Sequence, residues 1–187
     1  MRNKLIPTTT IGVFAIAIFA LSQFAVVRLR ATETTMTHIN IQIPDSIRTE
    51  HNAIHSVLME ATQAPGQVGV AARELAKVLH PHFEREEQIA LPPLGLLAPL
   101  AAGDKVSQET LSAILAMTDS LRAELPRMME EHKSIRVAVE KLRITARAAQ
   151  LTKYEQLAEE LALHAQTEEE VLYPAAVLVG DVIRMRK

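Results

Sequence analysis

The sequence contains no cysteine and only 6 glycines among its 187 residues. Without cysteine the chain can form no disulfide, no thiolate-bound zinc site and no iron–sulfur cluster, and it has no cysteine nucleophile. Any metal must therefore be held through nitrogen and oxygen. Long apolar–polar alternations typical of strands are also missing, whereas Ala, Leu and Glu abound. These features predict an all-α fold.

A strong charge of one sign is missing as well, because 20 basic side chains are balanced by 22 acidic ones, for a formal charge of −2. No block of Lys and Arg occurs after residue 45. We therefore expect no nucleic acid partner. The 7 histidines and the many carboxylates can supply the nitrogen and oxygen ligands of a metal site.

One long hydrophobic run lies near the N-terminus, at residues 11–27, "IGVFAIAIFALSQFAVV". Arg2 and Lys4 precede this run, and Arg28 and Arg30 follow it. The run is long for a signal-peptide core and just long enough to span a membrane when the preceding threonines are included. Arginines directly after the run argue against cleavage, because signal peptides usually continue into small, uncharged residues.

Residues 1–30 are therefore predicted to form a membrane anchor or signal-like segment, and residues 31–45 a linker. The chain would be membrane-anchored by this single N-terminal apolar helix. The positive charges on the two sides are nearly equal, so they do not predict its orientation. In the alternative, translation starts at Met36 and the protein is cytoplasmic.

The remainder, residues 46–187, is predicted to be one helical domain. Four stretches carry apolar residues three and four positions apart, the spacing of one helical face: 46–63, 68–91, 108–147 and 153–179. Pro126 is expected to end or kink the third of these.

The predicted helices contain a repeat. The second and fourth stretches match at positions 82 residues apart, in the pairs Leu75/Leu157, Leu79/Leu161, His82/His164, Glu86/Glu168, Ile89/Val171 and Pro92/Pro174. The first and third stretches match 81 residues apart, in the pairs Ile47/Met128, His51/His132, Ile54/Ile135 and Leu58/Val139. Two copies of a helical hairpin bury their apolar stripes most simply as an antiparallel up-down four-helix bundle.

Polar residues interrupt these apolar stripes at matching places: His51, His82, Glu86, His132, His164 and Glu168. Burying them without compensation costs several kcal/mol per charged group, as an order of magnitude. Two dications bridged by Glu86 and Glu168, with the histidines as terminal ligands, would remove this cost. Mixed nitrogen and oxygen ligands suit iron or manganese, with zinc as a further alternative.

His55 lies one helical turn after His51, whereas its counterpart in the repeat is Arg136. We interpret His55 as an additional metal ligand, which would give one ion three imidazoles and leave the other an open position for a small ligand. The alternative is a hydrogen-bonding histidine at the edge of the stripe. His80 is interpreted as a surface or supporting residue. The glutamates that lie off the apolar stripes are interpreted as solvated charges: Glu84, Glu87, Glu169 and Glu170.

These motifs resemble the hemerythrin-like, HHE cation-binding domain family. The resemblance rests on "HPHFEREEQIALPP", "EEHKSIRVAVEKL" and "LHAQTEEEVLYPA", and it extends from residue 46 to about residue 179. It implies an up-down four-helix bundle that holds two iron ions in a non-haem, oxo- or hydroxo-bridged di-iron centre. The implied ligands are His51, His82, His132 and His164, with Glu86 and Glu168 as bridges and His55 as the fifth histidine.

The chain departs from the oxygen-carrying members of that family in two places. Arg136 stands where a histidine is possible, and Glu168 follows its histidine by four residues where the carriers place an Asp one residue later. These differences argue against a pure oxygen-storage role and leave metal binding unaffected.

Three functions are compatible with this pattern. The first is a binding protein for a small oxidant (O2, NO or peroxide) that serves sensing, delivery or iron handling. The second is a di-iron enzyme that decomposes peroxide or repairs nitrosative or oxidative damage, with Tyr154 and Tyr173 among the candidate proton donors. The third is a membrane-tethered interaction module in which metal is absent or only structural.

Pro81 is unusual because it lies inside a predicted helix, in "LHPHFEREE". It cannot donate a hydrogen bond to the carbonyl of Lys77, so we expect the helix to bend just before His82 and to set the direction of that ligand. Leu163 takes the corresponding place before His164, so the two halves of the site need not be equivalent.

Overall fold

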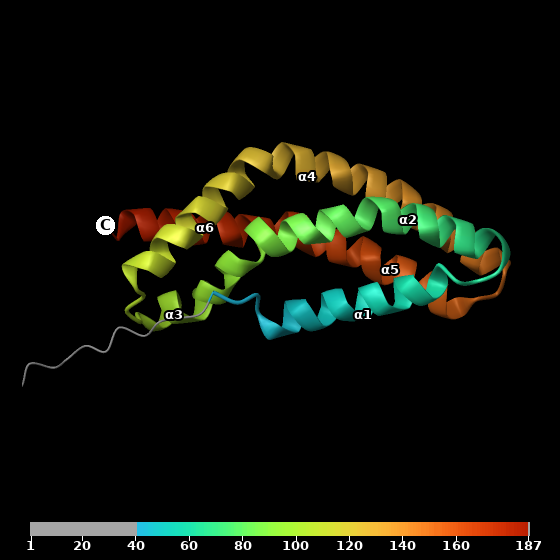
Figure 1. Cartoon of the computed structure of the whole chain (residues 1–187), viewed down its shortest axis with the longest axis horizontal. Coiled ribbons are helices and arrows are strands. Elements are labelled where there is room, and N and C mark those ends of the chain that lie inside the picture. The colour runs from blue at the N-terminus through green and yellow to red at the C-terminus, as the bar shows by residue number, and fades with distance from the viewer. Residues whose placement is uncertain (1–40, 187) are drawn as a thin grey trace, which may run out of the picture. The chain divides into compact units, whose positions relative to one another are not determined.

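The computed structural model describes residues 41–186, so the predicted anchor at residues 1–30 and most of the predicted linker lie outside the described range. Within that range the regular structure is helical (Figure 1), which confirms the all-α prediction there. The elements are α1 (Asp45–Ala61), α2 (Gly66–Arg85), the π-helix η1 (Glu86–Ala90), the 3-10 helix η2 (Pro92–Leu96), α3 (Leu97–Ala102), α4 (Gln108–Ala148), α5 (Thr152–Thr167), the π-helix η3 (Glu168–Leu172) and α6 (Tyr173–Met185). None of these helices combines the length and the apolar character that crossing a membrane requires.

The long helices form a closed ring. Helix α1 packs against α2 and α5, and α4 packs against the same two helices from the other side. The colours of Figure 1 show that α1, α2, α4 and α5 run in alternating directions along the chain. Residues 46–185 therefore form a helical bundle whose successive long helices are antiparallel.

The bundle interior has apolar zones on both sides of a polar layer. One zone is built around leucines that are buried in both copies of the repeat, including Leu75, Leu79, Leu157 and Leu161. Each such leucine contributes about 1.5–3 kcal/mol to folding. A second zone contains Leu121, Met128 and Tyr173, among others. The repeated histidines and glutamates lie between these zones, so packing on both sides fixes their height in the bundle.

Two prolines lie inside continuous helices. Helix α4 runs through Pro126, which is therefore not a helix end as one form of the prediction had it. Figure 1 shows α4 changing direction along its length instead. Pro81 lies within α2 without ending it. In both places the surrounding tertiary contacts outweigh the loss of one backbone hydrogen bond.

A π-helical turn begins at Glu86 and another at Glu168, a feature that the sequence prediction missed. The N–H of Leu91 donates to the carbonyl of Glu86 at 2.9 Å. In each copy a proline follows the glutamate six positions later, at Pro92 and Pro174. A proline has no N–H for the carbonyl four residues before it, so a wider turn costs little at this point. The two π-turns place the two glutamates equivalently in the bundle.

Candidate metal centre

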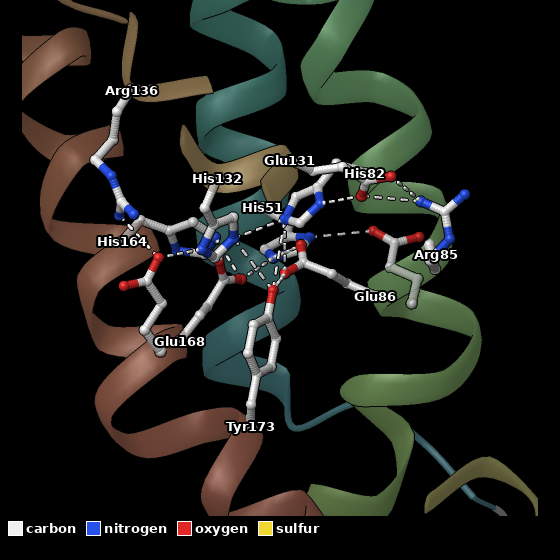
Figure 2. Close-up of polar contacts among 12 residues, drawn as sticks. His51, His82, Arg85, Glu86, Glu131, His132, Arg136, His164, Glu168 and Tyr173 are labelled. Atoms are coloured by element: carbon white, nitrogen blue, oxygen red, sulfur yellow. Dashed lines mark hydrogen bonds and ion pairs between the residues drawn. The ribbon is translucent and has the colours of Figure 1, made fainter. Parts of the chain in front are cut away.

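The predicted ligands come together in the polar layer, with the exception of His55. They are His51 from α1, His82 from α2, Glu86 from η1, His132 from α4, His164 from α5 and Glu168 from η3. Figure 2 shows their side chains pointing toward one another between the helices. All are buried, and even the most accessible of them, His164, is only 4 % exposed.

Two overlapping groups of donor atoms make up this cluster. We call His51 and His164 with the two glutamates the α1/α5 position, and His82 and His132 with the same glutamates the α2/α4 position. In each group one ligand atom per residue lies within 4.8 Å of the others. Glu86 and Glu168 belong to both groups, which is the arrangement required for two ions that share carboxylate ligands.

The donor atoms of the α2/α4 position lie close together. His82 Nε2 lies 3.2 Å from Glu86 Oε1, and His132 Nε2 lies 3.4 Å from Glu168 Oε2. The two Nε2 atoms are 2.8 Å apart. Four donor atoms thus converge on one point, as the ligands of a tetrahedral ion do.

The α1/α5 position is wider. His164 Nε2 lies 2.9 Å from Glu168 Oε1, but His51 Nε2 is 3.8 Å from the same oxygen and 4.0 Å from Glu86 Oε2. The ring of Phe83 stacks on His51 with centres 4.1 Å apart. Phe83 thus supplies an apolar wall to this position, where the second copy of the repeat has Ala165.

Unpaired buried atoms provide a direct test of whether a metal ion fits. Within residues 41–186, the buried atoms His51 Nε2, Glu86 Oε2, His164 Nε2 and Glu168 Oε1 make no hydrogen bond of regular geometry, although His164 Nε2 and Glu168 Oε1 lie 2.9 Å apart as an ion pair. Each such atom costs about 1–3 kcal/mol if it stays unsatisfied. All belong to the α1/α5 position, and a divalent cation would satisfy them together. The donor set therefore fits a metal ion.

Each histidine of the cluster presents its other ring nitrogen, Nδ1, to a second glutamate. The pairs are His51–Glu87 at 3.3 Å, His82–Glu131 at 3.0 Å, His132–Glu169 at 2.7 Å and His164–Glu50 at 3.1 Å. When Nδ1–H donates to a carboxylate, Nε2 is left as the free lone pair that a metal requires. The four outer glutamates thus orient the four imidazoles.

Sequence reasoning missed these outer glutamates and interpreted Glu87 and Glu169 as solvated charges. A signal was available, because each outer glutamate is adjacent in sequence to an inner ligand in both copies of the repeat. Consecutive helical residues point about 100° apart. A glutamate next to an inward-facing ligand therefore reaches sideways to the histidine of a neighbouring helix.

Arginines hold two of the outer glutamates. Glu131 accepts a hydrogen bond from Arg85 at 3.0 Å (Figure 2). It accepts another from Arg127 at 3.0 Å, and Glu169 accepts one from Arg136 at 2.8 Å. Arg136, which replaces a possible ligand in the sequence, thus acts on the metal site through Glu169 and His132. Both supported glutamates belong to the α2/α4 position.

Tyr173 adds a hydroxyl to the same position. It is fully buried, donates a hydrogen bond to Glu86, and lies 3.2 Å from His132 Nε2 and 3.4 Å from His82 Nε2. Burial, together with the charges of Glu86 and Glu168, raises the pKa of the Tyr173 hydroxyl, so it stays protonated at neutral pH. The equivalent residue in the first copy is Leu91, which has no hydroxyl.

The two shared glutamates differ in their electrostatics. Burial and the neighbouring Glu168 raise the pKa of Glu86. Burial also raises the pKa of Glu168, but the neighbouring imidazoles of His132 and His164 outweigh it and bring that pKa well below its usual value. Burial lowers the pKa of His164, yet Glu168 outweighs this effect and raises it to about 9. The metal-free cluster therefore holds protons, which an incoming cation would displace.

His55 lies outside both groups. The inward stripe of α1 passes through His51, Ile54 and Leu58, all of which are buried, whereas His55 is exposed. The ring of His55 lies instead beside that of His80, with centres 4.9 Å apart. A residue four positions along a helix is offset by about 40°, and here that offset turns the side chain out of the core.

No family model, no curated protein and no solved structure matches this chain. Its function must therefore be inferred from the chemistry of the cluster.

Proposed function

We propose that this protein is a non-haem di-iron protein of the hemerythrin-like type, which binds a small oxidant such as O2, NO or peroxide for sensing, delivery or iron handling. The observation that carries the proposal is the pair of four-residue groups that share Glu86 and Glu168. Two shared carboxylates and four imidazoles suit two iron ions, since no sulfur ligand is available. Bound iron would supply the affinity for the oxidant and the capacity to change oxidation state.

The protein's own residues then have defined tasks. The outer glutamates orient the imidazoles, and the apolar zones on both sides keep water from the ligands. The Tyr173 hydroxyl donates a hydrogen bond to Glu86 Oε1 at the α2/α4 position. The α1/α5 position is the one with unpaired donor atoms and a cavity beside it, so we propose that the external ligand approaches from that side.

The test is metal analysis combined with an optical spectrum of anaerobically reduced protein before and after exposure to O2 or NO. We expect two iron ions per chain and new near-UV and visible charge-transfer bands on exposure. Glu168→Ala should abolish both, whereas the exposed neighbour variant Glu170→Ala should behave like the wild type. Protein that retains two irons and shows no spectral change would contradict the binding of an oxidant but not that of iron.

Tyr173 favours a second candidate, a di-iron enzyme that decomposes peroxide. A buried phenol hydrogen-bonded to Glu86, and within 3.4 Å of His82 Nε2, can return a proton to a reacting oxygen. Steady-state consumption of hydrogen peroxide by the iron form, reduced in Tyr173→Phe at unchanged iron content, would favour this enzyme. Equal consumption by the two proteins would count against it.

A further inference from the structure

A cavity of about 290 Å³ opens beside the α1/α5 position. Its lining comes from α1, α2 and η1 and includes three histidines and two glutamates beside an amide and an aromatic ring: His51, Asn52, His55, His80, Phe83, Glu84 and Glu87. His51 belongs to the inner cluster, whereas His55 and His80 belong to neither inner group. The cavity thus contains two histidines that the proposed di-iron centre does not use.

His55 on α1 and His80 on α2 place their imidazole rings next to each other. Their ring centres are 4.9 Å apart and their planes are tilted by 58°. Because Zn–N bonds are about 2.0–2.1 Å long, two imidazoles that share a tetrahedral ion have ring centres about 5 Å apart. The observed spacing therefore already matches that of a two-nitrogen chelate. His55 is exposed and His80 is half-buried, so an ion could reach the pair from solvent.

Carboxylates lie where they would offset the charge of such an ion. Glu84 is one helical turn after His80 on the same helix, and both line the cavity. Glu87 places its carboxylate 3.3 Å from Nδ1 of His51. The cavity therefore contains ligands for a dication at its surface and adjoins a ligand of the inner cluster at its base.

The second copy of the repeat has no such pair. The residues corresponding to His55 and His80 are Arg136 and Ala162, and Arg136 is engaged with Glu169. The bundle therefore does not require histidines at these two places. The pair is an addition to one side of the molecule, the side of the wider metal position.

We propose that His55 and His80 form an outer site for one divalent transition-metal ion, separate from the buried cluster and open to solvent. Imidazole nitrogens favour Ni²⁺, Cu²⁺ and Zn²⁺ over Mg²⁺ and Ca²⁺, so the ligand is an ion of the former group or ferrous iron. Two imidazoles, with water completing the coordination, make a site that binds and releases its ion readily. The inference goes beyond the proposed function and does not depend on it.

Equilibrium dialysis of untagged full-length protein against Ni²⁺ tests this site. His55→Ala and His80→Ala should each bind one Ni²⁺ ion fewer than the wild type at saturation. The double variant should also bind one fewer, not two, because both side chains serve the same ion. The matched control, His38→Ala, should bind as many ions as the wild type. The expected difference of one ion holds whatever number the buried cluster takes, so failure of the proposed function would not mask it.

Three results would overturn the proposal. The wild type and both single variants could bind the same number of ions, or only one of the two histidines could matter. The double variant could instead lose two ions, which would make His55 and His80 independent surface ligands. Circular dichroism of each variant should match the wild type, because both side chains lie outside the apolar core.

Discussion

The α2/α4 position and the α1/α5 position share Glu86 and Glu168 but are held in different ways. At the α2/α4 position the outer glutamates, Glu131 and Glu169, are 26 % and 20 % exposed and are bound by arginines. At the α1/α5 position the outer glutamates, Glu50 and Glu87, are 53 % and 51 % exposed. An internal repeat has thus produced one firmly supported position and one accessible position. The difference suggests a division of labour between an ion that stays and an ion that meets the external ligand.

Removing a shared glutamate should have the largest effect, because it acts on both positions at once. We expect Glu168→Ala to lower the metal content from two ions per chain to fewer than one. It removes a carboxylate from both groups and leaves His164 without its buried partner. Metal analysis after gel filtration measures the change. Retention of one full ion would show that the positions are independent of their shared ligand.

Two single variants, each lacking one histidine from one position, test how firmly each position would hold its ion. We expect His164→Ala and His132→Ala each to lose one ion. The ion that remains in His164→Ala occupies the arginine-supported α2/α4 position and should withstand a chelator for longer than the ion that remains in His132→Ala. Metal content followed over time in EDTA compares the two. The reverse order of release would contradict the proposed difference in support.

Replacing an outer glutamate by glutamine shows how much that glutamate contributes to metal affinity at each position. Loss of a group that orients a metal-binding histidine typically costs about 10–100-fold in metal affinity. We expect Glu131→Gln to fall in that range, because Glu131 is more buried and is fixed by Arg85 and Arg127. Glu50→Gln should cost only a few-fold. Competition for Co²⁺ with a chromophoric chelator gives both affinities, and equal losses would remove the distinction.

The stability of the metal-free protein should depend on pH through the same residues. The pKa of His164 rises from 6.5 to about 9 on folding, so its contribution is complete below pH 6.5 and disappears as the pH rises through 9. Glu168, with its lowered pKa, contributes above pH 4.5 and loses its contribution as the pH falls below that value. Urea unfolding from pH 4 to pH 10 should therefore show greatest stability between 4.5 and 6.5. In His164→Gln the free energy of unfolding should decrease less steeply toward high pH than it does in the wild type.

Tyr173→Phe should have the smallest effect, confined to the α2/α4 position. The net contribution of one hydrogen bond is about 0.5–1.5 kcal/mol, and the ring itself keeps its packing. We expect a loss of stability of this size in the metal-free protein and an unchanged metal content. Denaturant unfolding measures the first and metal analysis the second. Loss of an ion would mean that the hydroxyl does more than donate a hydrogen bond to Glu86.

The helices and the inner ligands could be predicted from sequence because the repeat supplies two independent copies of each signal. His82 with Glu86 alone is ambiguous, but His164 with Glu168 on a matching apolar stripe is not. Both copies project the same residues inward, and burial confirms that placement for His51 and the other inner ligands. The bundle interior thus follows from spacing alone.

The features that could not be predicted depend on contacts between helices. Glu131 orients a histidine that is 49 positions away in sequence, and no periodicity within one helix reports such a contact. His55 lies on the exposed side of α1, although it is four positions from His51, because two residues four apart share a helical face only approximately. The π-turns were missed because α-helical periodicity assumes a constant pitch, although Pro92 and Pro174 mark both of them.

Helix α1 has one further consequence for the lifetime of ions in the proposed di-iron centre. It carries His51 and also Glu50, which bonds to His164 on α5. A fluctuation that lifts this helix from the bundle would remove one ligand of the α1/α5 position and release the orientation of the other, while leaving His82 and His132 untouched. Local opening of a single helix needs less free energy than global unfolding. The protein should therefore exchange its two ions at separate rates, with undocking of α1 setting the faster one.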